Sequence, residues 1–259
     1  MLRFRSLASG SAGNATLIEA RDGLHTTRVL VDCGLGWRQL LQSLARIDLL
    51  PGDLHGIFIT HEHGDHVGCA PLMAQRFGIP LWSSAGTLQA LRVAGYDGPA
   101  QVARDGDRLG IGALQLHPFT VPHDAREPLQ LRCTDGDRVL GILTDLGHVT
   151  AHVLAQLTSC HALMLESNHD PGLLARSSYP PFLQRRVAGQ HGHLSNGQAA
   201  EALAALKHDR LNIVVAAHLS ERNNRPELVQ AGFASVLGCG PQDVLLALRY
   251  GLDAGWLNV

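Results

Sequence analysis

The chain has 259 residues, of which 45% are hydrophobic and 17% charged, so it can bury a sizeable core and does not have the composition of a disordered protein. Its net charge of −2 gives no overall attraction to polyanions, so any binding of nucleic acid has to come from a local patch or from metal ions. No apolar run approaches the ~18 residues of a membrane-spanning helix, and the first residues lack a signal-peptide pattern, so we expect a cytoplasmic protein that does not contact membranes.

Short apolar runs and helical periodicity alternate along the chain, and no linker or repeat divides it. The apolar runs predict strands at Ala15–Glu19, Val29–Val31, Ile57–Ile59, Leu114–Phe119, Leu129–Cys133, Val139–Leu143, Leu163–Leu165, Ile213–Ala217 and Val244–Leu248. The helical spacing predicts helices at Trp37–Ile47, Ala70–Phe77, Thr87–Val93, Val149–Leu157, Pro180–Val187, Gln198–Leu206 and Glu227–Val236, the sixth of which follows a Ser195/Gln198 capping box. We therefore predict one α/β domain over residues 1–259, with helices covering mixed sheets.

The number and spacing of the cysteines and the number of histidines indicate which chemistry the chain supports. The five cysteines are scattered, odd in number and without a Cys-x-x-Cys pair, which indicates reduced thiols that serve as small core residues. Fifteen histidines accompany only three tyrosines and three tryptophans. Because histidine is the commonest metal ligand and titrates near neutral pH, this excess indicates metal binding or proton transfer.

The stretch GIFITHEHGDHVG places His61, His63, Asp65 and His66 directly after an apolar run. In a strand, side chains two residues apart share a face, so His61 and His63 are expected to point the same way. We expect Gly64 to turn the chain, so that the following aspartate and histidine approach from a loop. A solvated loop gives no reason to crowd partly protonated imidazoles, so the pattern predicts a metal site.

The His-x-His-x-Asp-His pattern resembles the signature of the metallo-β-lactamase superfamily. The other motifs of that superfamily are matched in order along the chain by Asp32 in VLVD, His123 in VPHDA, Asp145 in ILTDLG and His218 in VVAAHLS. The resemblance implies a four-layer αβ/βα sandwich, a metallo-β-lactamase fold, with the metal ligands at one edge of its sheets.

The same resemblance implies two divalent metal ions in each chain. The implied ligands are His61, His63 and His123 for one ion and Asp65, His66 and His218 for the other, with Asp145 between them and Asp32 orienting a ligand from behind. Imidazoles and carboxylates without a cysteine favour Zn²⁺, with Mn²⁺ as the alternative. Two cations roughly 3.5–4 Å apart activate water and stabilise developing negative charge, so hydrolysis is expected, with Asp65 counted among the catalytic residues.

A second pair of residues indicates which bond is cut. Glu166 ends the apolar run in LMLE, and His193 precedes a capped helix in GHLSN. In the tRNA 3′-processing and related phosphodiesterase branch of the superfamily, a similar histidine protonates the leaving alkoxide and is held by a strand-end glutamate, and the resemblance implies the same catalytic roles here. A phosphodiester needs such a donor because its leaving oxygen is poor, and a positioned histidine contributes ~10²–10⁴-fold. A polar loop histidine and a turn-capping carboxylate are the alternatives.

Over most of its length the chain is similar to the WalJ (YycJ) group of short nucleases of this fold, through SLASGSAGN, VDCG, THEHGDH, ESNHD and HLSERNN. Members of that group are associated with 5′→3′ exonuclease activity on DNA, which implies a nuclease acting on DNA or RNA. The segment between Asp145 and His218 is too short for the inserted nucleic-acid clamp domain of longer relatives. Substrate contacts therefore have to come from loops.

Two loops are candidates for those contacts. The glycines and serines of SGSAGN can expose backbone N–H groups to a phosphate, and the arginines and asparagines after His218 can contact flanking phosphates. An ordinary Gly-rich turn and a solvated helix end are the alternatives. The predicted substrate contacts are Ser9, Ser11, Asn14, Arg222, Asn223 and Asn224.

Other functions share the metal ligands. A hydrolase of small cyclic or aryl phosphodiesters would use the whole set, and so would a glyoxalase-type thioester hydrolase, although a thiolate leaves without a proton from His193. A metal-stabilised binding module without activity is the third alternative, and the full ligand set disfavours it. The oligomeric state does not follow from the sequence.

Overall fold

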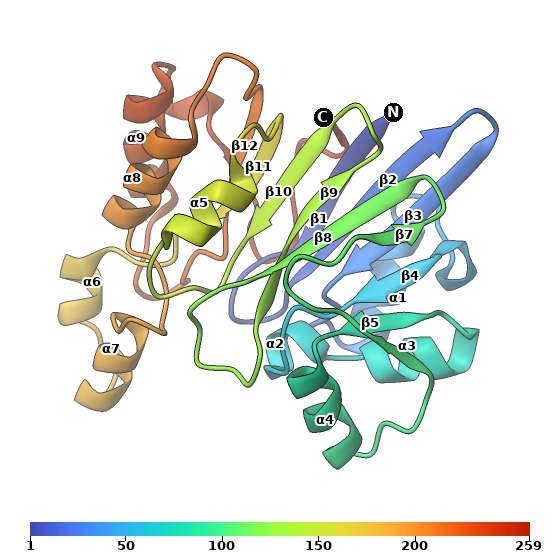
Figure 1. The fold of residues 1–259 in the computed structure, drawn as a ribbon. Coiled ribbons are helices and arrows are strands. Elements are labelled where there is room, and N and C mark those ends of the chain that lie inside the picture. The colour runs from blue at the N-terminus through green and yellow to red at the C-terminus, as the bar shows by residue number, and fades with distance from the viewer.

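Two sheets of seven strands each form the centre of the computed structural model, which describes residues 1–259 (Figure 1). The first sheet contains, from edge to edge, β14 (Leu257–Asn258), β1 (Leu2–Ala8), β2 (Ala15–Asp22), β3 (His25–Val31), β4 (Gly56–Phe58), β5 (Leu81–Ser83) and β6 (Ala100–Val102). The second contains β13 (Leu245–Leu246), β12 (Ile213–Ala217), β11 (Ala162–Glu166), β10 (Val139–Leu143), β9 (Leu129–Thr134), β8 (Leu114–Thr120) and β7 (Leu109–Ile111). Each sheet joins antiparallel strands to parallel ones: the pairs from β3 to β6 and from β10 to β13 are parallel.

Helices cover the outer face of each sheet (Figure 1). The first sheet is covered by α1 (Trp37–Ala45), α3 (Ala70–Phe77) and α4 (Ala85–Val93), and the second by α5 (Ala151–Leu157), α8 (Asn196–Leu206) and α9 (Pro226–Leu237). Three short helices, α2 (Gly64–Val67), α6 (Pro171–Ala175) and α7 (Pro181–Val187), and two 3₁₀ turns, Pro51–Asp53 and Pro241–Asp243, lie in the connections. None of these helices combines the length and apolar character needed to cross a membrane.

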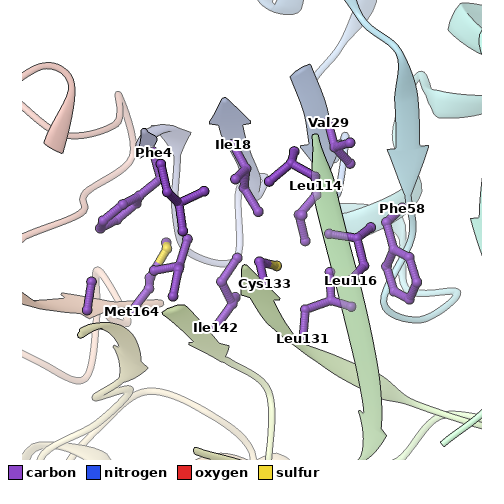
Figure 2. Close-up of a cluster of buried hydrophobic side chains, with 14 of the residues drawn as sticks. Phe4, Ile18, Val29, Phe58, Leu114, Leu116, Leu131, Cys133, Ile142 and Met164 are labelled. Carbon is purple, nitrogen blue, oxygen red and sulfur yellow. The ribbon is translucent and has the colours of Figure 1, made fainter. Parts of the chain in front are cut away.

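Three apolar clusters fill the spaces between the four layers. The cluster between the sheets includes Phe4, Ile18, Phe58 and Leu116 (Figure 2). The other two clusters lie between each sheet and its own helices. Burial of alternate side chains on both faces of a sheet is what selects this arrangement, because each sheet has to cover two apolar faces. The predicted αβ/βα sandwich is therefore confirmed.

The structure departs from the predicted elements where local patterns are weak. Strand β1 was not predicted because Arg3 and Arg5 interrupt the apolar run in the sequence, although they alternate with the buried side chains of the strand. Arg3 is held by the buried Glu19 of β2 at 2.6 Å. The short strands β5, β6, β7 and β14 were missed as well. Four of the five cysteines are buried, but Cys239 is exposed and does not serve as a core residue.

The metal-motif segment also differs from the prediction. Asp65 and His66 lie on helix α2 and not in a loop, and Gly64 is the first residue of that helix. The N–H groups of Val67 and Gly68 donate to the carbonyls of His63 and Gly64, both at 3.0 Å, so the chain continues directly from the motif into a helical turn. By contrast, Ser195 caps α8 through the predicted capping box, and that helix begins at Asn196.

Gly34 lies directly against the backbone of α2. A β-carbon at Gly34 would lie 1.6 Å from the carbonyl oxygen of Asp65, so Gly34→Ala forces the two segments apart. We expect this substitution to lower the free energy of unfolding by about 1–3 kcal/mol, as overpacking does in close-packed interiors, measured by urea denaturation. Gly52→Ala is the control, because a β-carbon there meets nothing within 4 Å. An equal loss of stability in both variants would contradict the prediction.

Candidate metal centre

The polar residues singled out in the sequence follow the carboxyl ends of strands from both sheets. Asp32 comes directly after β3 and His218 directly after β12, while Glu166 is the last residue of β11. Two residues separate the end of β4 from His61, and one residue separates the end of β10 from Asp145. Because the carboxyl ends of parallel strands lie at one edge of a sheet, residues far apart in the chain meet there.

Three of these residues have unusual backbone conformations. Asp32, Asp145 and His218 have φ angles of 58°, 53° and 55°, in the left-handed region that non-glycine residues seldom adopt. Such conformations persist only where the surrounding structure imposes them, and they are concentrated at functional sites. Here they turn the chain sharply at the strand ends.

The structure brings the seven predicted metal ligands together in the two predicted sets. His61, His63 and His123 form one set: Nδ1 of His63 lies 3.0 Å from Nε2 of His61 and 3.3 Å from Nε2 of His123.

Asp65, His66 and His218 form the other set. Oδ2 of Asp65 lies 3.6 Å from Nε2 of His66 and 3.7 Å from Nε2 of His218. Asp145 lies between the two sets, because it groups with His61 and His66 and its Oδ2 is 3.2 Å from Nε2 of His66.

The donor atoms fit cations. Asp145 and His218 are almost fully buried, yet Nε2 of His218 makes no hydrogen bond, and neither does Oδ2 of Asp145 despite its 3.2 Å approach to Nε2 of His66. Buried polar atoms without a partner are rare in folded proteins because they lose their hydration without compensation. Imidazole nitrogens and carboxylate oxygens are the usual ligands of Zn²⁺ and Mn²⁺. The chemistry of the site therefore favours divalent metal ions.

The charges inside the cluster support the same conclusion. Burial, followed by the neighbouring His66, lowers the pKa of His61 well below its usual range, and burial also lowers the pKa of His123. Burial would lower the pKa of His218 too, but the charge of Asp145 together with hydrogen bonds to Asp65 and Glu166 outweighs it and raises this pKa to about 10. His61 and His123 are thus kept neutral, as metal ligands have to be, while the carboxylates attract positive charge into the buried cluster.

Asp32 and Thr60 support two of these histidines from behind. Nδ1 of His66 lies 2.8 Å from Oδ2 of Asp32, which is the orienting position expected for this aspartate. The N–H group of Thr60 donates to Oδ1 of Asp32 at 2.9 Å, and the Thr60 hydroxyl lies 3.0 Å from both Asp32 and Nδ1 of His61. Sequence analysis missed Thr60, although a polar residue between an apolar run and the motif was the available signal.

Glu166 holds two histidines of the site. Its Oε1 lies 2.9 Å from Nδ1 of His193 and 3.0 Å from Nδ1 of His218, and its Oε2 accepts the N–H of Leu194 at 2.8 Å. Burial would raise the pKa of Glu166, but the charge of His193 and then hydrogen bonds from His193 and His218 lower it to about 2. Glu166 is therefore a carboxylate at neutral pH.

His193 is partly exposed and lines a cleft of about 400 Å³ together with His63, Asp65, His123, Asp145 and His218. Because Nδ1 of His193 is occupied by Glu166, Nε2 is the nitrogen available to a group in the cleft. All apolar residues of this cleft come from α7 and the segment before it, namely Tyr179, Leu183 and Val187. The metal ligands thus line one polar part of the cleft, and α7 with the segment before it supplies the apolar side chains.

The structure corrects the expectation for three of the predicted substrate contacts. The buried Ser9 accepts the N–H of His218 at 2.8 Å. Asn14 is also buried, accepts the N–H of Gly10 at 2.9 Å and places its Nδ2 3.1 Å from Nε2 of His66. Asn224 is buried and donates to the carbonyl of Ser167 at 2.8 Å. These hydrogen bonds to protein groups hold the site together, and Ser9 and Asn224 in addition line a neighbouring cleft of about 470 Å³.

The other three predicted contacts differ in exposure. Asn223 is 1% exposed, so its amide is not accessible from the surface. Ser11 is exposed and lines the same cleft as the metal ligands. Arg222 is exposed and lies over the ring of Tyr179, with 5.9 Å between Cζ and the ring centroid.

Comparison with known proteins agrees with this geometry. A model of the beta-lactamase superfamily domain matches residues 27–218. Exodeoxyribonuclease WalJ of Streptococcus pneumoniae is 32% identical over 231 residues, which cover 87% of this chain and 84% of that protein. Exodeoxyribonuclease YycJ of Bacillus anthracis is 31% identical over 239 residues, covering 91% and 89%. The crystal structure of Zn²⁺-bound PqqB from Methylobacterium extorquens superposes with a TM-score of 0.71 at 15% identity, over 99% of this chain and 100% of that one.

Replacing Thr60 tests its contribution to the metal ligands. Thr60→Val removes the hydroxyl that lies between Asp32 and His61, so these side chains are oriented less firmly. We expect the affinity for Zn²⁺ to fall by about 10–100-fold, the usual effect of removing a group that supports a metal ligand, measured by competition with a chromogenic chelator. Thr158→Val is the control, since its hydroxyl donates only to the carbonyl of Leu154. Unchanged affinity in Thr60→Val would show that the hydroxyl does not support the ligands.

Proposed function

The chain belongs to the β-lactamase superfamily, and we propose that it is a metal-dependent phosphodiester hydrolase that acts as a nuclease on the ends of DNA or RNA. The observation that carries this proposal is the His193–Glu166 pair: His193 lines the same cleft as the metal ligands, and the buried Glu166 holds it from behind. The exodeoxyribonuclease names of relatives that match most of the chain support DNA as a substrate. The resemblance to the WalJ group implies a 5′→3′ direction of attack.

We further propose that His61, His63 and His123 hold one divalent ion and that Asp65, His66 and His218 hold a second, with Asp145 shared between them. The grouping of these side chains and the unpartnered atoms of Asp145 and His218 support this assignment. Zn²⁺ is the favoured ion and Mn²⁺ the alternative. When bound, such a pair supplies an activated water and offsets the charge that develops on the attacked phosphate.

His193 is the residue that assists the leaving group in this proposal. The Glu166 carboxylate accepts a hydrogen bond from Nδ1 and so orients the ring, which leaves Nε2 to donate a proton to the leaving oxygen. This pair favours a phosphodiester over the thioester of a glyoxalase-type hydrolase, because a thiolate departs without a proton. A small cyclic or aryl phosphodiester remains the alternative substrate.

The location and extent of the protein follow from the same proposal. We propose one domain over residues 1–259 that works in the cytoplasm, where a chain with five free cysteines stays reduced. Because no clamp domain is inserted between Asp145 and His218, the loops around the cleft have to bind the substrate.

Removal of metal tests the proposed reaction. Treatment with EDTA is expected to abolish cleavage of end-labelled single-stranded DNA and hydrolysis of bis(p-nitrophenyl) phosphate, and Zn²⁺ or Mn²⁺ is expected to restore both. Reconstituted protein is expected to hold two ions per chain by elemental analysis. A single ion per chain would contradict the two-ion assignment, and faster turnover of S-lactoylglutathione than of either phosphodiester would contradict the nuclease proposal.

Replacement of His193 tests the proton transfer. His193→Ala is expected to lower kcat on DNA by ~10²–10⁴-fold. It is expected to lower kcat far less on the p-nitrophenyl ester of thymidine 5′-phosphate, because p-nitrophenolate leaves without a proton. His191→Ala is the control, since His191 is exposed two residues away. Equal losses on both substrates would instead indicate that His193 only supports the structure.

A further inference from the structure

The metal cleft does not end at the metal ligands but continues into three further clefts. Ser11 and Tyr179 line both the metal cleft and a neighbouring cleft of about 170 Å³. Ser220 and Glu221 line both this neighbour and a larger cleft of about 470 Å³. Arg249 lines both the larger cleft and a fourth of about 240 Å³. Since each cleft shares lining residues with the next, the four adjoin one another in a row that starts at the metal ligands, and we treat this row as one groove.

Arginines and tyrosines both line this groove. We call its part beyond the metal cleft the arginine groove, and its main residues are Tyr179, Arg222, Arg225, Arg249, Tyr250 and Arg46.

Two arginine–tyrosine pairs lie in the arginine groove. Cζ of Arg222 lies 5.9 Å from the ring centroid of Tyr179, and Cζ of Arg249 lies 5.8 Å from that of Tyr250. Tyr250 is 77% exposed, so one face of its ring is available to a ligand. Exposed aromatic faces beside arginines are the arrangement on which successive bases of a single strand stack.

The charge of the arginine groove differs from that of the whole chain. Four arginines and only two carboxylates, Glu221 and Asp253, line it, whereas the chain as a whole has a net charge of −2. Glu221 is 3.4 Å from Arg249, and both side chains are largely exposed, so this ion pair yields easily to a phosphate. The local positive charge that the composition of the chain lacks is therefore found in the groove.

We propose that the arginine groove binds a single strand of nucleic acid and leads it to the metal cleft. This inference rests on the proposed nuclease function and deepens it, because it names the substrate as a single strand of several nucleotides and not a small phosphodiester. The arginines contact the phosphates, and Tyr179 and Tyr250 stack against bases. A duplex does not fit this role, because its base faces are already covered by neighbouring bases.

The inference predicts how cleavage depends on strand length. KM for single-stranded DNA is expected to fall as the strand lengthens from two nucleotides and to level off within the ~4–16 nucleotides that grooves of this kind accommodate. A KM that does not change between a dinucleotide and a 20-mer would overturn the inference.

Two substitutions at the far end of the groove test the binding without catalysis. Fluorescence anisotropy with a labelled 20-nucleotide single strand and EDTA-treated protein measures the affinity directly. We expect Arg249→Ala and Tyr250→Ala each to weaken it by about fivefold or more, as the loss of one stacked base does. We also expect Arg249→Ala, but not Tyr250→Ala, to reduce the slope of log K against log salt concentration by about 0.7, the value for one phosphate contact on a single strand. Arg76→Ala is the matched control, because Arg76 also lies over an aromatic ring, that of Trp37 at 5.4 Å, outside the groove.

The result separates this inference from the proposed function. In metal-loaded protein, the ratio of kcat/KM for the 20-mer to that for bis(p-nitrophenyl) phosphate is expected to fall in Arg249→Ala and Tyr250→Ala and to stay constant in Arg76→Ala. Suppose that the wild-type protein cleaves DNA but that the groove variants match the Arg76→Ala control in their affinity for the strand and in the salt dependence of that affinity. The groove inference is then overturned and the nuclease proposal stands. If the wild-type protein cleaves no nucleic acid, the nuclease proposal itself fails.

Discussion

The packing of the two sheets against each other is the constraint on which the site depends. The apolar cluster that includes Phe4, Ile18, Phe58 and Leu116 fixes the sheets face to face (Figure 2). The carboxyl ends of β3 and β4 are thereby held beside those of β10, β11 and β12, and neither sheet alone supplies both sets of metal ligands. The apolar faces of the two sheets are buried against each other, away from the site, because this removes them from water. That packing brings residues that lie far apart in the chain into one cluster.

Much of this arrangement was predictable from the sequence. The crowding of histidine and aspartate in the His61–His66 motif predicted a metal site directly. The later ligands His123, Asp145 and His218 were assigned because they match the motifs of the superfamily in order, and each of them also follows an apolar run. A polar residue that follows a strand stands next to that strand in the chain, so this pattern can be recognised from the sequence alone. The apolar runs and helical periodicity predicted one α/β domain with helices covering mixed sheets, whereas the four-layer sandwich was implied by the resemblance to the metallo-β-lactamase superfamily.

The burial of individual polar side chains, and the groups that they contact in the fold, could not be predicted in the same way. Ser9, Asn14 and Asn224 are small polar residues in loops, which is equally typical of substrate contacts and of groups that hold a buried site together. Only the fold shows that they donate to or accept from protein groups. The same holds for Thr60, whose role depends on Asp32 from another strand, and for Tyr250, whose place beside the groove depends on the position of β13.

The left-handed backbone at Asp32, Asp145 and His218 has a consequence for the evolution of such sites. Glycine adopts this conformation without steric cost, whereas other residues lose of order 1–3 kcal/mol. Glycine at these turns would relieve the steric cost, but it would also leave the buried N–H of Thr60 without Asp32 and the buried Glu166 without His218. Exchange for glycine is therefore not a simple route to a more stable chain, because the same side chains that complete the cluster also satisfy buried groups around it.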